Sequence, residues 1–311
     1  MNKTVVISGI SGFIGRYVAR ELLMRGCNVV GIVRDRSKIT DELIKKEAIL
    51  IESDFSDQST LVQKLIPAHC DVFVHLAWSG VDNASNGTTL PYEQLSNVNA
   101  ACSAAQVSVS IGVTRFIFCG SDWQYKRQKK DIYKKTVYDF YGAAKKCAAD
   151  MCRLISEKNS TSYFNVLPAN VFGPGDYSNR SINTFILKML KNEPLNLIDY
   201  SKLKDWVFVE DAAKAFAEIA LAPDSDMYEI YVGHEVLYTF GDLVTSLKQC
   251  LGSKSELRFG QYIEDVMVDT TAIDTSSLRK LTGYSLPSNL ETNFIKTCSW
   301  QTERYMKEGL L

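Results

Sequence analysis

The chain has 311 residues, of which 46% are hydrophobic, and a formal net charge of −1 at pH 7. A chain of this length can bury a large core, as one large domain or two associated ones. The near-zero charge excludes a global basic field that recruits nucleic acid or anionic lipid, and no apolar run approaches the ~18 residues of a membrane span.

The cysteines and histidines lack the spacing of metal ligands. No two cysteines form a C-x-x-C pair, most have apolar neighbours, and only three histidines accompany them. This pattern is typical of free, buried thiols in a reducing compartment. We therefore expect a cytoplasmic protein without a bound metal. The cysteines are Cys27, Cys70, Cys102, Cys119, Cys147, Cys152, Cys250 and Cys298.

The chain begins with a strand, a glycine-rich turn and a helix. The apolar run Val5–Ser8 predicts a buried strand, and Ile14, Val18 and Leu22 share one face of the helix that follows. A second buried strand is predicted at Val29–Val33. This order is the beginning of a parallel α/β sheet rather than a signal peptide.

Strand-like and helical segments continue to alternate, which predicts a Rossmann-type, doubly wound parallel sheet. Further strands are expected at 48–52, 72–76, 116–119 and 164–167. Helices are expected near 58–66, 92–112, 139–158, 181–191, 210–221, 239–251 and 288–307.

The regular alternation loosens after Phe172–Gly175, where short and irregular segments predominate. No linker rich in Pro or Ser separates two independent units. We therefore expect a dinucleotide-binding core at 1–168, to which 205–234 returns. The segments 169–204 and 235–311 are expected to form a smaller α/β lobe that binds the substrate.

Gly9, Gly12 and Gly15 follow the first strand with the spacing G-x-x-G-x-x-G. Glycines between a strand and a helix let the backbone approach a pyrophosphate and direct the helix N-terminus toward it. The alternative is a plain strand–turn–helix whose glycines serve packing only.

Tyr141 and Lys145 lie four residues apart in a predicted helix and therefore share one of its faces. A nearby ammonium lowers the pKa of a phenol, which prepares the phenol for proton transfer. The alternative is a core tyrosine and a surface lysine on an amphipathic helix.

This ordered set of motifs resembles the extended short-chain dehydrogenase/reductase family of nucleotide-sugar epimerases, dehydratases and reductases. The resemblance runs over nearly the whole chain. Besides the glycines and the Tyr141–Lys145 pair, it rests on Val74–Ala77, Asn97–Asn99, Phe116–Ser121, Asn170–Gly175 and Asp205–Asp211.

The resemblance implies a nicotinamide cofactor. It assigns cofactor contacts to Gly9, Gly12, Phe13, Ile14, Gly15, Arg34, Arg36, Asp54, Phe55, Leu76, Ala77, Tyr141, Lys145 and Pro168. The tip of the second strand, where an NAD site usually has an acid, is Val33, and Arg34 and Arg36 follow it. Guanidinium groups suit a 2′-phosphate, so we expect NADP, with NAD as the alternative if Asp35 turns toward the ribose.

Asp54 and Phe55 resemble the pair that contacts the edge of the adenine in this family. Their alternative is a loop acid and a core aromatic.

Ser121, Tyr141 and Lys145 correspond to the catalytic residues of the family. The Ser hydroxyl and the Tyr phenol there bond the substrate oxygen that becomes, or ceases to be, a carbonyl. Substrate contacts are expected from Trp78, Asp122, Trp123, Asn170 and Lys204. The two tryptophans either form the wall of a sugar pocket or are ordinary core aromatics.

Departures from the family narrow the expected chemistry. Dehydratases place an Asp-Glu pair after the serine or threonine, but Ser121 is followed by Asp122 and Trp123, so a 4,6-dehydratase is not expected. Lys204 stands where relatives often have Arg. The run 126–130 is basic where relatives are acidic, which indicates a solvated charged loop or a lid attracted to a diphosphate.

We therefore expect an NADPH-dependent 4-reductase of a CDP- or dTDP-linked 4-keto-6-deoxyhexose. The alternatives are a nucleotide-sugar 4-epimerase that retains NAD, a reductase of a small non-nucleotide ketone, and a non-catalytic NADP(H) sensor. A homodimer is expected through helices 92–112 and 139–158, whose exposed faces are predicted to carry Ala101, Ala105, Val109, Ala144, Ala148 and Met151.

Overall fold

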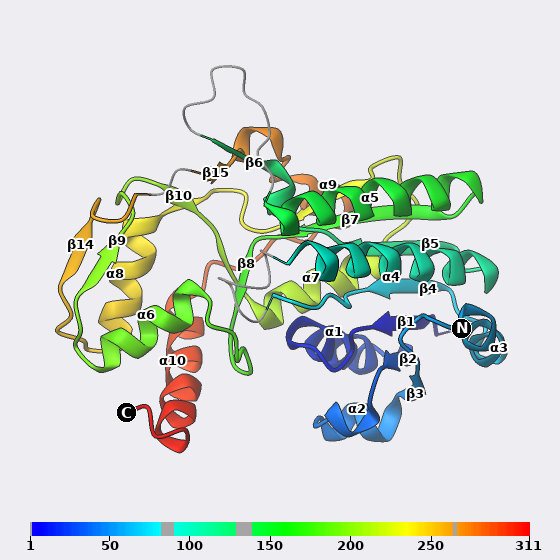
Figure 1. The fold of residues 1–311 in the computed structure, drawn as a ribbon, viewed down its shortest axis with the longest axis horizontal. Helices are drawn as coiled ribbons and strands as arrows, with labels where there is room; N and C mark the ends of the chain where they lie inside the picture. The colour runs from blue at the N-terminus through cyan, green and yellow to red at the C-terminus, as the bar shows by residue number, and fades with distance from the viewer. Residues whose placement is uncertain (1, 82–89, 129–138, 264–265) are drawn as a thin grey trace.

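Seven parallel strands form the central sheet of the computed structural model (Figure 1), which describes residues 2–81, 90–128, 139–263 and 266–311. Their order across the sheet is β12-β7-β5-β4-β1-β2-β3. The chain runs outward from β1 to β3 and returns on the other side of β1 with β4. The sheet therefore has a switch point between β1 and β4, where doubly wound folds bind dinucleotides.

The prediction of a doubly wound parallel sheet is thus confirmed. The strands are β1 (Thr4–Ser8), β2 (Asn28–Val33), β3 (Ile49–Glu52), β4 (Val72–His75), β5 (Arg115–Cys119), β7 (Ser162–Pro168) and β12 (Glu229–Val232).

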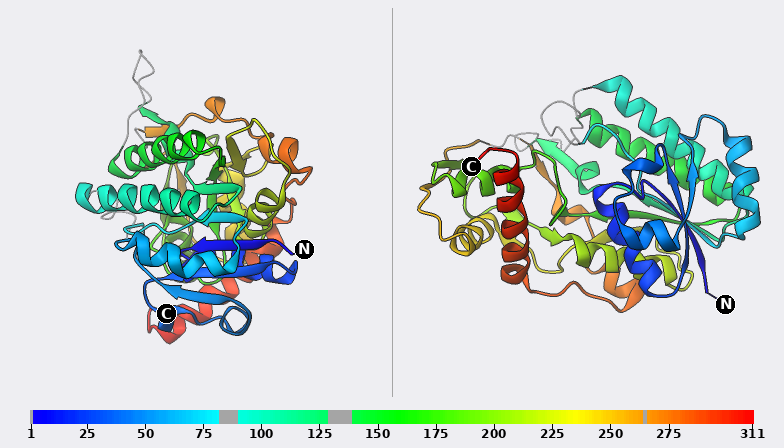
Figure 2. Two further views of the ribbon diagram at one scale, coloured as in Figure 1. Left: turned by 90° about the vertical axis from the view of Figure 1, so that its right-hand side faces the viewer. Right: turned by 90° about the horizontal axis from the view of Figure 1, so that it is seen from below.

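Helices cover both faces of the sheet, because the buried strands are apolar on both sides. Val5 and Ile7 of β1 join the core beneath one set of helices, whereas Val6 joins the core beneath the other. The first set is α1 (Phe13–Met24), α7 (Val209–Leu221) and α9 (Ser277–Thr282). The second set is α3 (Gln58–Leu65), α4 (Pro91–Ser110) and α5 (Phe140–Lys158), and Figure 2 shows α4 and α5 side by side.

A third core, rich in aromatic residues, lies in a smaller lobe at the carboxyl edge of the sheet. Its helices are α6 (Ser181–Leu190), α8 (Phe240–Cys250) and α10 (Leu290–Lys307). Its short strands pair as β8 (Asn170–Phe172) with β11 (Trp206–Phe208), β9 (Leu195–Leu197) with β14 (Leu257–Phe259), and β10 (Leu203–Lys204) with β13 (Tyr238–Thr239). The strand β6 (Lys126–Gln128) pairs with β15 (Val266–Val268).

All eight predicted helices are present, including α1 after the glycine turn, but two more of six residues each were not predicted. These are α2 (Glu42–Glu47) and α9. In α2 only Ile44 is buried, so the segment has no apolar period that the sequence reveals. The predicted division at residue 168 stays a prediction.

The predicted dimer faces of α4 and α5 were partly wrong. Ala101, Ala105, Ala144 and Ala148 are buried, because the two helices pack against each other and against the sheet. Of the six residues predicted for these faces, Met151 is exposed and Val109 is half-buried. Alanine rows lie where two helices approach closely within one chain, and the sequence pattern does not distinguish this from contact between chains.

The buried Arg115 ties the end of α7 to the beginning of β5. Its guanidinium donates to the carbonyls of Ile219, Ala220, Ala222 and Pro223 at 2.7–3.3 Å. The last carbonyls of a helix have no intrahelical partner, so this side chain takes the place of a C-terminal cap.

Arg115→Met should lower the free energy of unfolding by roughly 3–5 kcal/mol, because each buried carbonyl that loses its donor costs about 1–3 kcal/mol. Urea unfolding followed by circular dichroism measures this change. Arg258→Met is the control, since Arg258 pairs with Glu256 on the surface and should change stability by less than about 1 kcal/mol. Equal stability of the two variants would contradict the capping role.

Candidate active site

The glycine turn lies at the switch point, against the loop that follows β4. Gly9 has a φ of +75°, and a Cβ there would lie 2.7 Å from the backbone nitrogen of Ala77. A Cβ on Gly15 would overlap the carbonyl oxygen of Gly9. Both positions therefore require glycine, and the turn presents bare backbone at the carboxyl edge of the sheet.

The first turn of α1 is open for an anion. Phe13 and Ile14 begin the helix, and Gly12 at the N-cap provides no side-chain cap for their N–H groups. Uncapped N–H groups and the helix dipole attract a phosphate. The residues present thus fit the diphosphate of a dinucleotide, with Leu76 and Ala77 beside it.

The adenosine end would lie over β2 and β3. Arg34 is exposed, whereas the exposed Arg36 turns back to donate from Nη2 to the Leu50 carbonyl at 2.7 Å. Hydrogen bonds from the Ser56 hydroxyl and from its backbone N–H lower the pKa of the Asp54 carboxyl, with a smaller contribution from Arg34. Phe55 is buried with its ring 5.8 Å from that of His75.

Ser121, Tyr141 and Lys145 come together at the carboxyl end of β5. The ammonium of the buried Lys145 donates to the carbonyl of Cys119 at 2.7 Å, and Ser121 follows that strand. Tyr141 lies one turn before Lys145 on α5, and hydrogen bonding by Ser121 acts on its phenol. The structure therefore unites three residues that the sequence separates.

Two local features place Tyr141. Asp139 caps α5 by accepting from the Gly142 backbone N–H at 2.7 Å. A Cβ on Gly142 would lie 2.9 Å from the Trp123 carbonyl, so glycine lets α5 approach the 3₁₀ helix η4 (Asp122–Tyr125). The ring of Trp123 then packs edge-to-face on Tyr141, with centroids 5.5 Å apart.

Burial dominates the protonation of this site. It raises the pKa of the Tyr141 phenol, against the lowering effects of Ser121 and of the Arg180 charge. Burial also lowers the pKa of Lys145 to about 8. The phenol is thus fully protonated at neutral pH, and most of Lys145 remains an ammonium.

Arg180 is a residue that the sequence analysis missed. It lies just before α6 and donates to the Val171 carbonyl at 3.3 Å, and its charge opposes the rise that burial causes in the pKa of Tyr141 and of Cys119. It adds a second positive charge near the phenol. No local pattern marks it, because it follows an irregular loop.

A polar network that holds η4 was also missed. The hydroxyl of Tyr125 donates to Glu229 at 2.5 Å, and Asn165 donates to both Glu229 and Gln124. Glu229 and Asn165 belong to neighbouring strands β12 and β7. The segment that carries Asp122 and Trp123 is therefore anchored to the sheet edge.

Asn170, a predicted substrate residue, begins β8, which pairs with β11. Lys204, another, ends β10 two residues before β11 begins. The backbone and side chain of Asn170 donate to the Asp205 carbonyl at 3.3 Å. The Asp205 carboxylate accepts from Tyr231 and His234, and it raises the pKa of His234 although burial lowers it. Pro168 ends β7 beside Val232.

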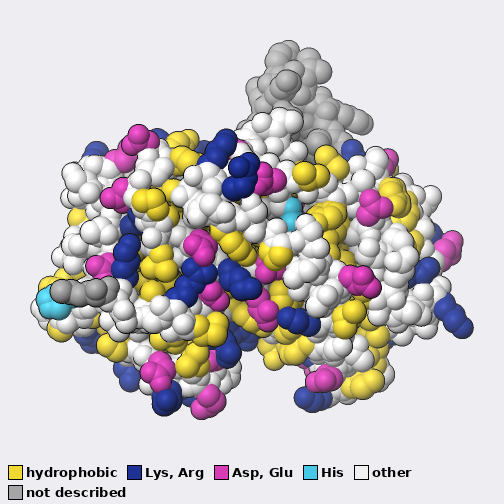
Figure 3. All heavy atoms as spheres, turned by 180° about the vertical axis from the view of Figure 1, so that it is seen from behind, with side chains coloured by type: hydrophobic (Ala, Val, Ile, Leu, Met, Phe, Trp, Pro, Cys, Tyr) yellow, Lys and Arg dark blue, Asp and Glu magenta, His cyan; other side chains and the backbone are white. Residues whose placement is uncertain are grey.

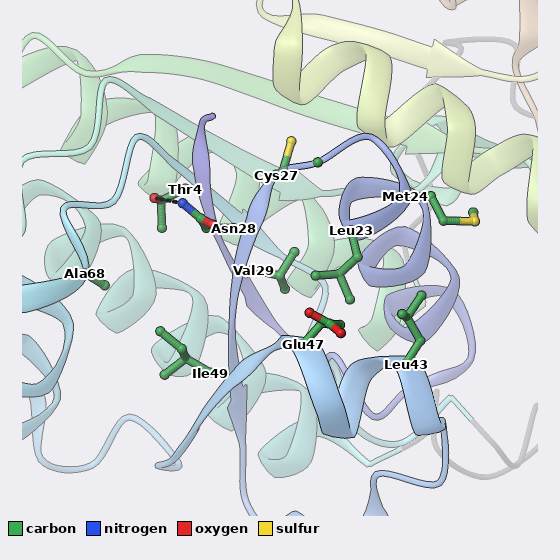
Figure 4. Close-up of a pocket in the computed structure, with 11 residues that line it drawn as sticks. Thr4, Leu23, Met24, Cys27, Asn28, Val29, Leu43, Glu47, Ile49 and Ala68 are labelled. Atoms are coloured by element: carbon green, nitrogen blue, oxygen red, sulfur yellow. Dashed lines mark hydrogen bonds between the residues drawn. The ribbon is translucent and has the colours of Figure 1, made fainter. Parts of the chain in front are cut away.

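Two cavities lie elsewhere. The larger, of about 460 Å³, is lined by Thr4, Cys27 and Asn28 at the amino edge of the sheet, opposite the glycine turn (Figure 4). The second, of about 280 Å³, is beside His234. Neither lining includes Ser121, Tyr141 or Lys145.

The surface carries charges of both signs, which are intermixed on the face seen in Figure 3. Within the described ranges, no helix combines the length and the apolar character that crossing a membrane requires. The same residues contain no group of three or more His, Cys, Asp or Glu side chains placed to hold a metal ion. Lys129 and Lys130 of the basic run lie outside the described residues.

Residues 5–232 match the NAD dependent epimerase/dehydratase family. The chain belongs to this family. The match includes the glycine turn, the residues Ser121, Tyr141 and Lys145 and the strands that position them, so the expected family is confirmed.

Two curated relatives of similar length are a synthase and a reductase of nucleotide-linked sugars. The chain is 22% identical over 304 residues to CDP-abequose synthase of Salmonella muenchen, covering 96% of this chain and 98% of that protein. It is 24% identical to dTDP-4-dehydro-6-deoxy-D-allose reductase of Streptomyces sp, covering 96% of each. A longer relative from Arabidopsis thaliana is 22% identical, and the chain covers 47% of its length. That relative is a trifunctional UDP-glucose 4,6-dehydratase/UDP-4-keto-6-deoxy-D-glucose 3,5-epimerase/UDP-4-keto-L-rhamnose-reductase.

Solved structures with the same fold include epimerases. UDP-glucose 4-epimerase of Thermotoga maritima, with UDP-glucose, has a TM-score of 0.76 at 19% identity and covers 97% of this chain and 99% of its own. UDP-glucuronic acid 4-epimerase of Bacillus cereus, with NAD, has a TM-score of 0.76 at 16% identity and covers 97% and 98%.

Proposed function

We propose that this chain uses NADPH to reduce the C4 ketone of a nucleotide-linked 4-keto-6-deoxyhexose, a CDP- or dTDP-sugar of surface-polysaccharide biosynthesis. The carrying observation is the Tyr141 phenol, which burial keeps protonated beside the Ser121 hydroxyl. Full-length similarity to two deoxy-sugar enzymes supports this substrate class. The eight free thiols support a cytoplasmic enzyme.

The residues divide the work of a carbonyl reduction. When bound, the nicotinamide cofactor supplies the hydride that reaches C4. Ser121 donates a hydrogen bond to the carbonyl oxygen, and Tyr141 transfers its phenolic proton to that oxygen as the C–H bond forms. The phenolate is stabilised by the charges of Lys145 and Arg180 until it regains a proton from solvent.

A 4-epimerase that retains NAD is the second candidate, because the solved neighbours include epimerases. An epimerase oxidises and reduces the same carbon, so it uses the same trio but does not exchange its cofactor. NAD that remains bound through purification and is released only by denaturation would favour this alternative.

Tyr141→Phe should slow reduction by about 10²–10⁴-fold, the usual contribution of a positioned acid or base, with NADPH affinity unchanged. Turnover is measured by NADPH absorbance with the CDP- and dTDP-linked 4-keto-6-deoxy sugars. Tyr262→Phe is the control, since Tyr262 is 61% exposed in the smaller lobe. Near-normal turnover by Tyr141→Phe would refute the assignment.

Arg34 should contribute more than Arg36 to the preference for NADPH, because Arg36 already donates to Leu50. Arg34→Ala should weaken NADPH binding by about 1.5–3 kcal/mol, the range for hydrogen bonds to charged groups, and leave NADH binding almost unchanged. Calorimetric titration with each cofactor measures this. Lys38→Ala, another exposed cation of the same turn, is the control. Equal binding of both cofactors by the unaltered protein would contradict the 2′-phosphate assignment.

We further propose a homodimer in which the outer faces of α4 and α5 meet their copies. The exposed apolar side chains there are Leu95, Phe140, Met151 and Leu154. Apolar side chains exposed on two adjacent helices form the self-complementary patch that a twofold contact requires.

Met151→Glu should convert the dimer to a monomer at micromolar concentration, because the interface would then bury two unpaired carboxylates. Light scattering measures the mass. Met306→Glu is the control, because Met306 is also an exposed methionine on a helix but lies on α10 of the smaller lobe; it should leave the mass unchanged. A fully active monomer of the unaltered chain would contradict this assembly.

A further inference from the structure

Lys145 is a buried cation that forms no ion pair with any residue that the structure describes. Its side chain is 4% exposed, and its ammonium donates to the carbonyl of Cys119. Among the described residues, no carboxylate lies within ion-pair distance of this ammonium. Instead it lies 3.8 Å from the centroid of the Trp78 ring, with Phe118 and Tyr141 farther away at 5.2 and 5.8 Å.

The Trp78 indole is held in this orientation by α4. Its Nε1 donates to the side chain of the buried Gln94 at 3.0 Å. The next residue, Ser79, exchanges backbone hydrogen bonds with the Asn97 side chain. On its other side, the Trp78 ring contacts the Tyr141 ring edge-to-face, with the ring centroids 6.2 Å apart and the ring planes at 88°. This contact restricts rotation of the indole. The ring face is therefore fixed over Lys145.

The groups around Lys145 are largely neutral. On β4, burial lowers the pKa of His75 to about 3, and burial raises the pKa of the thiols of Cys119 on β5 and Cys152 on α5. Tyr141 on α5 is protonated. Two charges act on the pKa of its phenol: Arg180 before α6 lowers it, and Asp122 from η4 raises it.

We propose that Trp78 is a positioning residue that keeps Lys145 as an ammonium by a cation–π contact. The proposal rests on the roles given above to Tyr141 and Lys145. An indole has the strongest negative face among the aromatic side chains, and the attraction grows when the cation is desolvated. A carboxylate in the same place would also stabilise the ammonium, but it would cancel the positive charge that a phenolate needs. Trp78 stabilises the cation and leaves the charge in place.

The sharpest test changes the charge of the ring face without changing its shape. Tryptophans with one, two and three fluorine atoms are introduced at position 78, and the pKa of Lys145 is read by NMR of ¹³C-labelled lysine, with Lys145→Met to assign the signal. Fluorine withdraws charge from the ring face, so the pKa should fall stepwise, by about one unit over the series. The same series at Trp206, which packs on Phe240 and Phe294 in the smaller lobe, should leave it unchanged.

A flat pKa across the series at position 78 would overturn the proposal. This titration needs neither cofactor nor substrate, so its failure is distinct from a failure of the proposed reaction. In turnover assays, the pH above which the rate falls should shift to lower values as the pKa of Lys145 decreases. A rate profile that stays in place while the pKa falls would show that the contact does not serve Tyr141, and it would also overturn the proposal.

Discussion

The hydrogen bond from the Lys145 ammonium to the Cys119 carbonyl connects α5 to the carboxyl end of β5, and the geometry of the candidate site depends on it. Cys119 ends the strand, and Ser121 follows two residues later. The bond therefore sets the position of α5 relative to Ser121, and Tyr141, one turn earlier on the same face, lies beside that hydroxyl. A buried ammonium is costly unless its environment stabilises it, so the residues around Lys145 are as constrained as the catalytic groups.

The remaining contacts of the site hold backbone segments close together. Gly142 lets η4 approach α5, and the network of Tyr125, Asn165 and Glu229 anchors η4 to the edge of the sheet. Buried polar networks of this kind define one arrangement when their members are paired. The same logic applies at the glycine turn, where Gly9 lies against Ala77. Close backbone packing thus brings the glycine turn and the side chains of Ser121 and Tyr141 to the same carboxyl edge of the sheet.

The reductase and the epimerase share these groups and differ in what must leave the site. A reductase exchanges its cofactor after each turnover, whereas an epimerase retains it. The protonated phenol of Tyr141 suits the reductive direction, in which the enzyme donates a proton. The exposed Arg34 suits a site at which a 2′-phosphate binds and dissociates, because surface charge raises association rates. Both features suit the proposed reductase, whereas the solved epimerases show that the same fold also carries epimerisation.

The sequence by itself determined the features that depend on near neighbours. Apolar runs predicted the strands of the sheet, glycine spacing predicted the turn after β1, and the four-residue spacing of Tyr141 and Lys145 placed them on one face of α5. Local periodicity carries this information because strands and helices repeat over a few residues.

Only the tertiary structure decided which distant groups meet. The contact of Trp78 with Lys145, the position of Arg180 and the bond between Tyr125 and Glu229 join residues far apart in the chain. Packing also decided that Ala101 and Ala148 are interior, since alanine gives no polar or apolar period that separates a core face from an exposed one. Such contacts depend on how elements cross, and that is set by side-chain packing over the whole fold.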